Sequence, residues 1–211
     1  INFLRKFDIK FIIIACGTAS SAALPHITTE YDTDIIGVVE PASKMAVNAT
    51  KNGRIGGLGT KGTINSGKYS QKIRNLNAEI EVISNACPMF VPIVENGYAD
   101  TEVARILAEE YLDVMIKKNV DTIILGCTHY PLIYDIIDRA LGSRVTLIDA
   151  GKQVARWAQG YLAREDLLAG PGGGGTEFYV SDSPDGFSEI AGLFLGGDVK
   201  GDVTQIDLDT L

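Results

Sequence analysis

The sequence predicts an α/β protein made of two similar lobes, each a mostly parallel sheet flanked by helices. Apolar, β-branched runs alternate with helical patterns along the chain, and a succession of strand, helix and strand is typical of parallel sheets. The chain also resembles itself, because the pattern of residues 9–16 recurs at residues 120–127 with a cysteine at the same place. Two facing lobes of similar build would leave such a repeat.

The predicted strands are short runs rich in isoleucine and valine, bounded by polar or turn-forming residues. In chain order they are KFIIIAC (residues 10–16), DIIGVVE (34–40), RIGGLG (54–59), EIEVIS (79–84), DTIILGC (121–127), VTLIDA (145–150) and TEFYVS (176–181).

Helices are predicted where apolar residues recur at steps of three and four. The first begins at a cap formed by Asp100 or Thr101, and its apolar positions are Val103, Ile106, Leu107, Tyr111, Val114 and Met115. The second has the positions Val154, Trp157, Ala158, Tyr161 and Leu162. The third starts at Ser183 and Pro184, with Phe187, Ile190, Ala191 and Phe194 on its inner face.

Charge and hydropathy limit the classes of partner. The chain has 19 Lys and Arg against 27 Asp and Glu, a net charge of −8, which argues against nucleic acid or an acidic membrane surface as the main partner. The longest purely apolar run, residues 11–16, is far shorter than the roughly 20 residues of a membrane span. We therefore expect a cytoplasmic protein that acts on a small molecule.

The three cysteines, Cys16, Cys87 and Cys127, are odd in number and widely spaced, which favours reduced thiols over disulfides. A zinc site assembled from Cys16, Cys87 and His26 is one alternative. No CxxC pair supports it, so we predict no metal.

Cys16 and Cys127 occupy equivalent places at the ends of two predicted strands. Thiols on opposite sides of one ligand can remove a proton from one face of a carbon and return a proton to the other, which inverts the configuration. His129 is a candidate to lower the pKa of the second thiol. Thr18 and Thr128 could hold a carboxylate, or they could simply cap helices. For Cys87, which precedes a proline, inert packing is the preferred interpretation.

A nucleotide site is the main rival interpretation. The segment GLGTKG, residues 57–62, is a GxGxxG pattern after a predicted strand, and Glu81 lies at a suitable distance along the chain for a ribose contact. The overlapping segment GTINSGKY nearly matches a phosphate-binding P-loop, but Tyr69 stands where a serine or threonine must bind magnesium. A single glycine motif in a chain with 23 glycines is a weak signal.

Four segments carry a resemblance to a known family. They are IIIACGTAS (residues 12–20), GTKGTINSGKY (59–69), ACPMFVPIVENG (86–97) and ILGCTHYPLI (124–133), and LIDAG and FYVSD follow in order. Together they resemble the glutamate racemases of the aspartate/glutamate racemase superfamily. The second cysteine segment and the acidic segment around Glu95 are the most specific.

The resemblance implies an isomerase that interconverts L- and D-glutamate without pyridoxal phosphate, metal or other cofactor, and that supplies D-glutamate for peptidoglycan, the cell wall and hence cell shape. It implies one lobe from residues 1–40 with 151–211 and a second from residues 41–150. The implied catalytic residues are Cys16, Cys127, His129 and Glu95. The implied substrate-binding positions are Gly17, Thr18, Thr60, Thr63 and Thr128.

Two departures from the family pattern set further expectations. The family has Cys-Asn-Thr in its first cysteine motif, and here Gly17 replaces the asparagine whose amide holds the substrate. The family's Asp-Ser-Gly motif and a tyrosine-containing loop would precede residue 1, so we expect roughly 60 residues upstream. We therefore expect the 211-residue chain by itself to be inactive or nearly so.

Alternatives from other classes stay open. One is a catalytically inactive relative that binds an acidic metabolite or a protein partner, which Gly17 favours. Another is an aspartate racemase, since members of the superfamily share the plan with two cysteines. The sequence leaves the oligomeric state open, a homodimer included.

Overall fold

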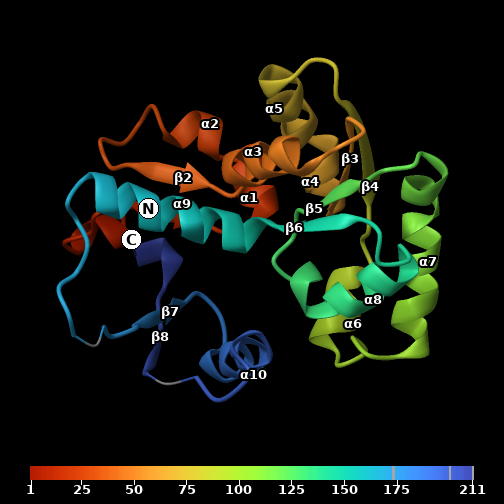
Figure 1. Cartoon of the computed structure of the whole chain (residues 1–211). Coiled ribbons are helices and arrows are strands. Elements are labelled where there is room, and N and C mark those ends of the chain that lie inside the picture. The colour runs from red at the N-terminus through yellow and green to blue at the C-terminus, as the bar shows by residue number, and fades with distance from the viewer. Residues whose placement is uncertain (173, 200, 211) are drawn as a thin grey trace. The chain divides into compact units, whose positions relative to one another are not determined.

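Figure 1 shows the computed structural model, which describes residues 1–172, 174–199 and 201–210. The chain divides into two compact units, one of Lys10–Leu167 and the other of Ile1–Ile9 with Leu168–Leu211. These divisions differ from the lobe boundaries expected after residues 40 and 150, and the division into lobes stays a prediction.

The larger unit contains two parallel sheets, as the sequence predicts. In the first, β1 (Ile12–Ile14) pairs with β2 (Ile35–Gly37). In the second the strand order is β4 (Glu81–Ala86), β3 (Arg54–Gly59), β5 (Thr122–Leu125) and β6 (Thr146–Asp149). Every pairing among these strands is parallel, which confirms the α/β class.

The helices of this unit connect the strands in the way that parallel pairing requires. They are α1 (Gly17–Ala22), α2 (Leu24–Ile27), α3 (Val39–Ala49), α4 (Lys61–Asn65), α5 (Lys68–Leu76), α6 (Phe90–Glu95), α7 (Glu102–Lys117), α8 (Tyr134–Ala140) and α9 (Ala150–Arg164), with the 3-10 helix η2 (Tyr130–Ile133). Side-chain caps fix several starts. Thr101 accepts a hydrogen bond from the Ala104 N–H and begins α7, as predicted, and Asp149 begins α9.

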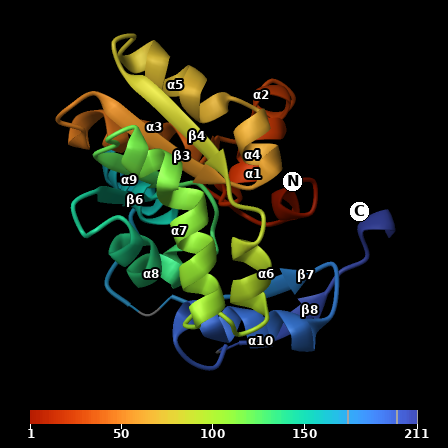
Figure 2. The same ribbon diagram turned by 90° about the vertical axis from the view of Figure 1, so that its right-hand side faces the viewer.

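Helices cover both faces of the four-stranded sheet. Ile123 and Leu125 of β5 pack into a core with α6, α7 and α8, whereas Ile124 between them packs into a second core with α3, α5 and α9. This alternation follows from the two-residue period of a strand. Figures 1 and 2 show the two helical layers on opposite sides of the sheet. A strand with both faces buried reads as a continuous apolar run, as β5 does.

The inner face predicted for α7 is partly wrong. Val103 and Ile106 are 50% and 51% exposed, and the fully buried positions are Ala104, Ala108, Leu112 and Met115. A Cβ placed on Gly56 of the sheet would lie 2.9 Å from the Met115 sulfur, so helix and sheet approach closely. Small alanines permit that approach, and a search for large apolar residues overlooks them.

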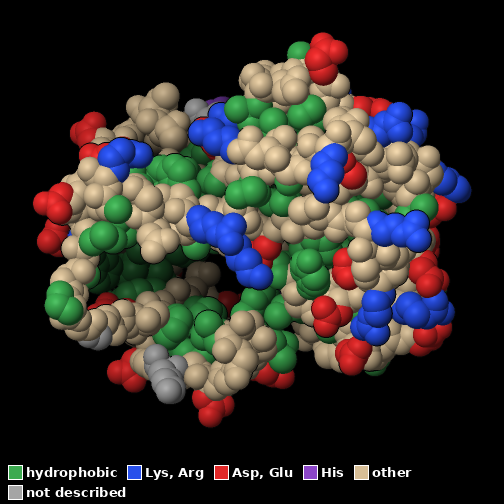
Figure 3. Space-filling view, viewed as in Figure 1, with side chains coloured by type: hydrophobic (Ala, Val, Ile, Leu, Met, Phe, Trp, Pro, Cys, Tyr) green, Lys and Arg blue, Asp and Glu red, His purple; other side chains and the backbone are tan. Residues whose placement is uncertain are grey.

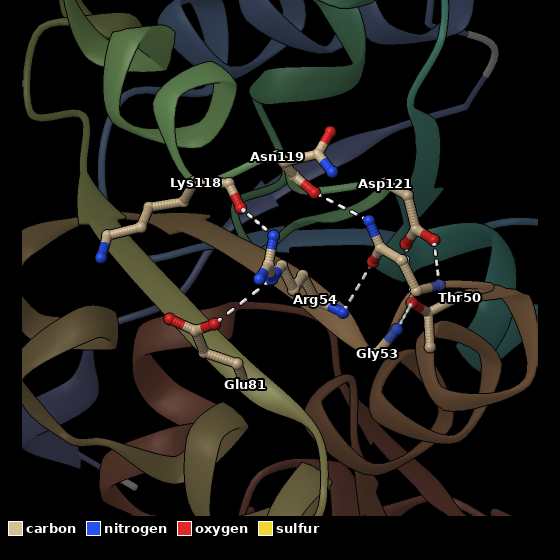
Figure 4. A network of polar contacts seen from close by, with 8 residues as sticks. Thr50, Gly53, Arg54, Glu81, Lys118, Asn119 and Asp121 are labelled. Carbon is tan, nitrogen blue, oxygen red and sulfur yellow. Dashed lines mark hydrogen bonds and ion pairs between the residues drawn. The ribbon is translucent and has the colours of Figure 1, made fainter.

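A network at the amino end of the sheet joins β3 to β5 (Figure 4). The Asp121 carboxylate accepts hydrogen bonds from the Thr50 hydroxyl at 2.6 Å and from the backbone N–H groups of Lys51 and Asn52 at 2.7 and 2.8 Å. Burial alone would raise the pKa of Asp121, but these hydrogen bonds lower it overall. The loop before β3 is therefore held to the start of β5.

The position of Glu81 at the amino end of the sheet contradicts the interpretation of residues 57–62 as a nucleotide site. Glu81 pairs in register with Arg54 at the amino end of the sheet, and their side chains form an ion pair at 3.4 Å (Figure 4). A ribose contact requires an acidic residue at the carboxyl end, where the glycine loop lies. Glu81 is thus at the wrong edge of the sheet for that role.

The smaller unit contains the 3-10 helices η1 (Leu4–Lys6) and η3 (Leu208–Thr210), the strands β7 (Phe178–Val180) and β8 (Val203–Gln205), and helix α10 (Pro184–Leu195). The two strands are parallel, and α10 connects them. Ser183 caps α10, as predicted, and the ring of Phe187 packs 5.4 Å from that of Phe178. The sequence did not predict β8.

The surface carries mixed charge on the face seen in Figure 3, where basic and acidic side chains are interspersed. Ion pairs among the described residues include Lys72 with Glu40 at 2.8 Å and Lys117 with Asp113 at 2.6 Å. Among the described residues, no helix has the length and apolar character that a membrane crossing needs.

Candidate functional site

The candidate residues gather at the carboxyl end of the four-stranded sheet. Strand β3 lies between β4 and β5: the chain goes from β3 to β4 on one side and then crosses to β5 on the other side, so the strand order switches between β3 and β5. Ligands of open α/β sheets bind outside the carboxyl ends of strands at such a switch point. Thr60 directly follows β3 and Cys127 lies two residues after β5, which places both motifs at this point.

Cys127 is half-buried beside His129 and Glu95. The Cys127 sulfur lies 3.9 Å from His129 Nδ1, and the other ring nitrogen, Nε2, lies 2.9 Å from a carboxylate oxygen of Glu95. Glu95 is the last residue of α6, so one helix end orients the imidazole. The Thr128 hydroxyl lies 3.2 Å from Nδ1 on the same side as the sulfur. The imidazole of His129 thus lies between the thiol of Cys127 and the carboxylate of Glu95.

Groups around Cys127 shift the pKa of its thiol in opposite directions. Burial raises the pKa of the Cys127 thiol, and the negative charge of Cys16 raises it further. Hydrogen bonds from the His129 backbone N–H and the Thr128 hydroxyl act in the other direction. At rest the thiol form is favoured, and a neighbouring base is needed to take its proton.

Cys16 stands at the start of α1, after β1. It is exposed, and its sulfur accepts the Ala19 N–H at 3.5 Å, so the cysteine itself is the helix cap. A negative charge on Cys16 would raise the pKa of the Cys127 thiol.

The backbones of the two cysteine motifs touch. A Cβ built on Gly17 would lie only 2.1 Å from the carbonyl oxygen of Gly126 and 3.5 Å from the Thr63 hydroxyl. Gly17 directly follows Cys16, and Gly126 directly precedes Cys127. The absence of a side chain at position 17 is what allows this approach. The structure thus brings the two segments related by the internal repeat into contact.

Three threonine hydroxyls form a triangle beside this contact. Thr18 Oγ1 lies 2.8 Å from Thr60 Oγ1 and 3.0 Å from Thr63 Oγ1, and the Thr60 and Thr63 oxygens are 3.1 Å apart. Thr60 also caps α4 by accepting the Thr63 N–H at 3.2 Å. Thr18 comes from the segment after β1, and Thr60 and Thr63 come from the segment after β3. Together the three hydroxyls offer donors to an anionic group.

Cys87 lies apart from this chemistry, in the core. It is fully buried, and its thiol donates to the Asn85 carbonyl at 3.8 Å. Burial, together with the charge of Cys127, raises the pKa of Cys87 to about 12. The preference for inert packing at this cysteine is consistent with these contacts.

Sequence reasoning missed two residues of the site, Gly126 and Tyr69. Tyr69 is 4% exposed, and its ring lies against Gly126, where an added Cβ would be 3.1 Å from the ring carbon Cε2. The sequence offered a signal, since Tyr69 closes the GTINSGKY segment, but there it counted only as a mismatch to a P-loop. Within the described residues, no cluster of three or more His, Cys, Asp or Glu side chains could bind a metal ion.

Known families and proteins resemble this chain over most of its length. The sequence model of the Asp/Glu/Hydantoin racemase family matches residues 1–158. A glutamate racemase of Geobacter metallireducens is 41% identical over 209 residues, which are 99% of this chain and 77% of the relative.

Solved structures agree with the fold. A glutamate racemase isoform from Bacillus anthracis superposes with a TM-score of 0.92 at 34% identity, over 98% of this chain and 77% of that one. A glutamate racemase from Francisella tularensis, crystallised in complex with D-glutamate, gives a TM-score of 0.90 at 33% identity, over 99% of this chain and 78% of that one.

Proposed function

The chain belongs to the Asp/Glu/Hydantoin racemase family, and from this premise we propose that it interconverts L- and D-glutamate by acid-base catalysis with Cys16 and Cys127. The observation that supports the proposal is the close contact of Gly17 with the Gly126 carbonyl, because Gly17 directly follows Cys16 and Gly126 directly precedes Cys127. The named relatives are glutamate racemases, which supports glutamate as the substrate.

In this mechanism one cysteine acts as a thiolate and removes the α-proton, while the other, still a thiol, delivers its proton to the opposite face. The carbon gains the inverted configuration, and the negative charge passes from one sulfur to the other. No oxidant or reductant is needed, since one proton leaves and one arrives. Positioning of both sulfurs matters because each must meet the same carbon.

His129 and Glu95 would prepare Cys127 for its part. A hydrogen on Nε2 is donated to the Glu95 carboxylate, and this tautomer leaves Nδ1 as an acceptor facing the Cys127 sulfur at 3.9 Å. Nδ1 can then accept the thiol proton, and the Glu95 charge stabilises the imidazolium that forms. Burial of the thiol favours its neutral form, so this help is required when Cys127 is the base.

The hydroxyl triangle would hold a carboxylate of the substrate. Thr18, Thr60 and Thr63 now satisfy one another at 2.8 to 3.1 Å, and each hydroxyl can rotate its hydrogen toward an incoming anion. Thr128 lies on the Cys127 side and would complete the cradle. The product D-glutamate would serve cell-wall peptidoglycan synthesis in the cytoplasm.

The test is exchange of the α-hydrogen of glutamate with solvent, followed by proton NMR in D2O with each enantiomer and no added cofactor. The measurement uses the full product of the gene that encodes this chain. We expect deuterium incorporation that is abolished by Cys16→Ser and by Cys127→Ser, with both variants folded. Cys87→Ser serves as the matched control and should retain exchange. A folded protein that exchanges neither enantiomer would contradict the proposal.

An inactive relative is the second candidate, and Gly17 favours it. The position lacks the amide that the family pattern places there, and a side chain cannot be added without moving the Gly126 carbonyl. Titration calorimetry combined with the exchange measurement separates the two candidates, because an inactive relative would bind glutamate and leave its α-hydrogen unexchanged. Exchange of aspartate in preference to glutamate would instead indicate an aspartate racemase.

A further inference from the structure

Tyr130 is the largest fully buried side chain among the described residues, and it directly follows His129 in the chain. It begins the 3-10 helix η2, and its hydroxyl donates a hydrogen bond to the Cys87 carbonyl at 3.0 Å. The backbone N–H of Tyr130 donates to the Cys127 carbonyl at 3.2 Å. One residue therefore contacts the segment of Cys127 through its backbone and the segment after β4 through its side chain.

The segment after β4 leads directly into α6, the helix that ends at Glu95. Phe90, the first residue of α6, donates its N–H to the same Cys87 carbonyl at 3.2 Å. Its ring is fully buried and meets the ring of Tyr130 edge-to-face, with the ring centroids 5.2 Å apart and the planes at 88°. The start of α6 and the residue after His129 are thus packed against each other in the core.

The pair of Glu95 and His129 lies nearer to solvent than these contacts. The side chain of Glu95 is 39% exposed and that of His129 is 17% exposed, with 2.9 Å between a carboxylate oxygen and Nε2. A partly exposed pair contributes little to order, because water competes for both groups. Closely packed, hydrogen-bonded side chains in the interior are far more rigid. The geometry of the pair thus depends on how the two backbone segments are held together.

We propose that Tyr130 is a positioning residue: its ring and hydroxyl fix α6 against η2, and so hold the Glu95 carboxylate at the distance that orients the His129 imidazole. This rests on the proposed function, in which His129 accepts the proton of Cys127. At 3.9 Å from Nδ1 the Cys127 sulfur is at the far end of hydrogen-bond range, so a small displacement of the ring breaks the contact.

The hydroxyl of Tyr130 can be removed without disturbing the rest of the core. Tyr130→Phe keeps the ring and therefore the packing volume. The Cys87 carbonyl still accepts the Phe90 N–H, so no buried group is left without a partner. What the variant loses is the direct hydrogen bond between η2 and the carbonyl that precedes α6.

The experiment reads the imidazole itself by nitrogen-15 NMR, which shows which ring nitrogen carries the hydrogen. It uses the same full gene product as the exchange test, at pH 8, where an ordinary imidazole is neutral. The 211-residue sequence contains two histidines, His26 and His129, and the signal that disappears in His129→Gln belongs to His129. In the parent we expect His129 to carry its hydrogen on Nε2. In Tyr130→Phe we expect a mixture of both tautomers at His129, with His26 unchanged.

Activity and stability are measured on the same samples. For Tyr130→Phe we expect kcat for glutamate to fall about tenfold, less than the roughly 10²–10⁴ that an acid-base group contributes, because the group is displaced and not removed. KM should change by less than about twofold, since the substrate contacts stay in place. The melting temperature should fall by roughly 2–4 °C, the effect of one hydrogen bond.

Ile137→Val is the matched control for a general loosening of the core. Ile137 is fully buried in the same core and belongs to α8. Its replacement by valine should lower the melting temperature by a similar few degrees. We expect the His129 tautomer and the rate of glutamate exchange to stay as in the parent.

Phe90→Leu tests the same link from the side of α6, because it removes the edge-to-face contact and leaves the hydroxyl in place. It should also mix the tautomers of His129, and it decides the question if Tyr130→Phe does not fold.

Three results would overturn the inference. The first is a pure Nε2 tautomer in folded Tyr130→Phe. The second is a mixture in Ile137→Val as large as in Tyr130→Phe, because any loosening of the core would then suffice. The third is undiminished exchange, relative to an active parent, in a variant with mixed tautomers. The NMR readout needs no turnover. Mixed tautomers in Tyr130→Phe, in a protein whose parent never exchanges glutamate, would therefore uphold the role of Tyr130 and contradict only the proposed function.

Discussion

Replacing Gly17 by alanine should separate the two cysteine motifs. The added Cβ would lie 2.1 Å from the Gly126 carbonyl oxygen, whereas such atoms essentially never come within 3.0 Å of each other. The two backbones must therefore move apart by about 0.9 Å, the difference between these distances. Neither side offers a flexible side chain that could absorb the movement, since the obstacle is itself backbone.

The magnitude follows from the size of this displacement. Overpacking of a buried site costs about 1–3 kcal/mol, and each kcal/mol lowers the melting temperature of a domain of this size by roughly 2–4 °C. A misplacement of about 1 Å between reacting groups can lower a rate about 10²-fold. We therefore expect Gly17→Ala to melt several degrees lower and to exchange the glutamate α-hydrogen about 10²-fold more slowly. Gly17→Asn, which restores the family residue, should behave no better.

Gly160→Ala is the matched control. Gly160 lies on the exposed side of α9, and a Cβ there would have open space around it. Alanine in a helix should add about 0.5–1 kcal/mol of stability at such a position and leave exchange unchanged. Differential scanning calorimetry and NMR exchange in D2O provide the two readouts. A Gly17→Ala variant with the melting temperature and exchange rate of the parent would refute the reasoning.

Three further outcomes are expected. Burial raises the pKa of Cys87 to about 12, so with rising pH the unfolded chain loses the Cys87 proton before the folded chain does. The free energy of unfolding should therefore fall above pH 9 by up to about 1.4 kcal/mol per pH unit. Urea unfolding of Cys87→Ala should show a shallower fall with pH. Asp121→Asn should lower the free energy of unfolding by about 1–3 kcal/mol at pH 7, because the ionised carboxylate of Asp121, whose pKa is lowered in the fold, stabilises the protein at neutral pH. The difference in stability between variant and parent should vanish as acid protonates the carboxylate. A difference that persists at pH 2 would contradict this prediction. Glu95→Gln should slow glutamate exchange about tenfold or more with little change in melting temperature, since it removes the charge that faces His129; unchanged exchange would show that the pair is structural.

Local chemistry was enough to predict every strand except β8 from the sequence. The seven predicted strands all exist as strands, because β-branched runs between polar residues favour a pleated, buried backbone. Thr101 and Ser183 begin their helices as expected, since a hydroxyl cap acts only on the residues that follow it. The short β8 lacked such a signal, as its three residues include only one aliphatic side chain.

The arrangement of the site depended on contacts that no local pattern encodes. The sequence placed Cys16 and Cys127 at strand ends, but the approach of Gly17 to the Gly126 carbonyl arises only when two distant segments pack. The face that α7 buries was decided in the same way, by which side fits closely against Gly56. The contact of the Tyr69 ring with Gly126 likewise arises only when distant segments pack together. Close packing depends on how two surfaces fit each other. A local segment of sequence determines the side chains of one surface, but only the tertiary structure determines which surface it meets.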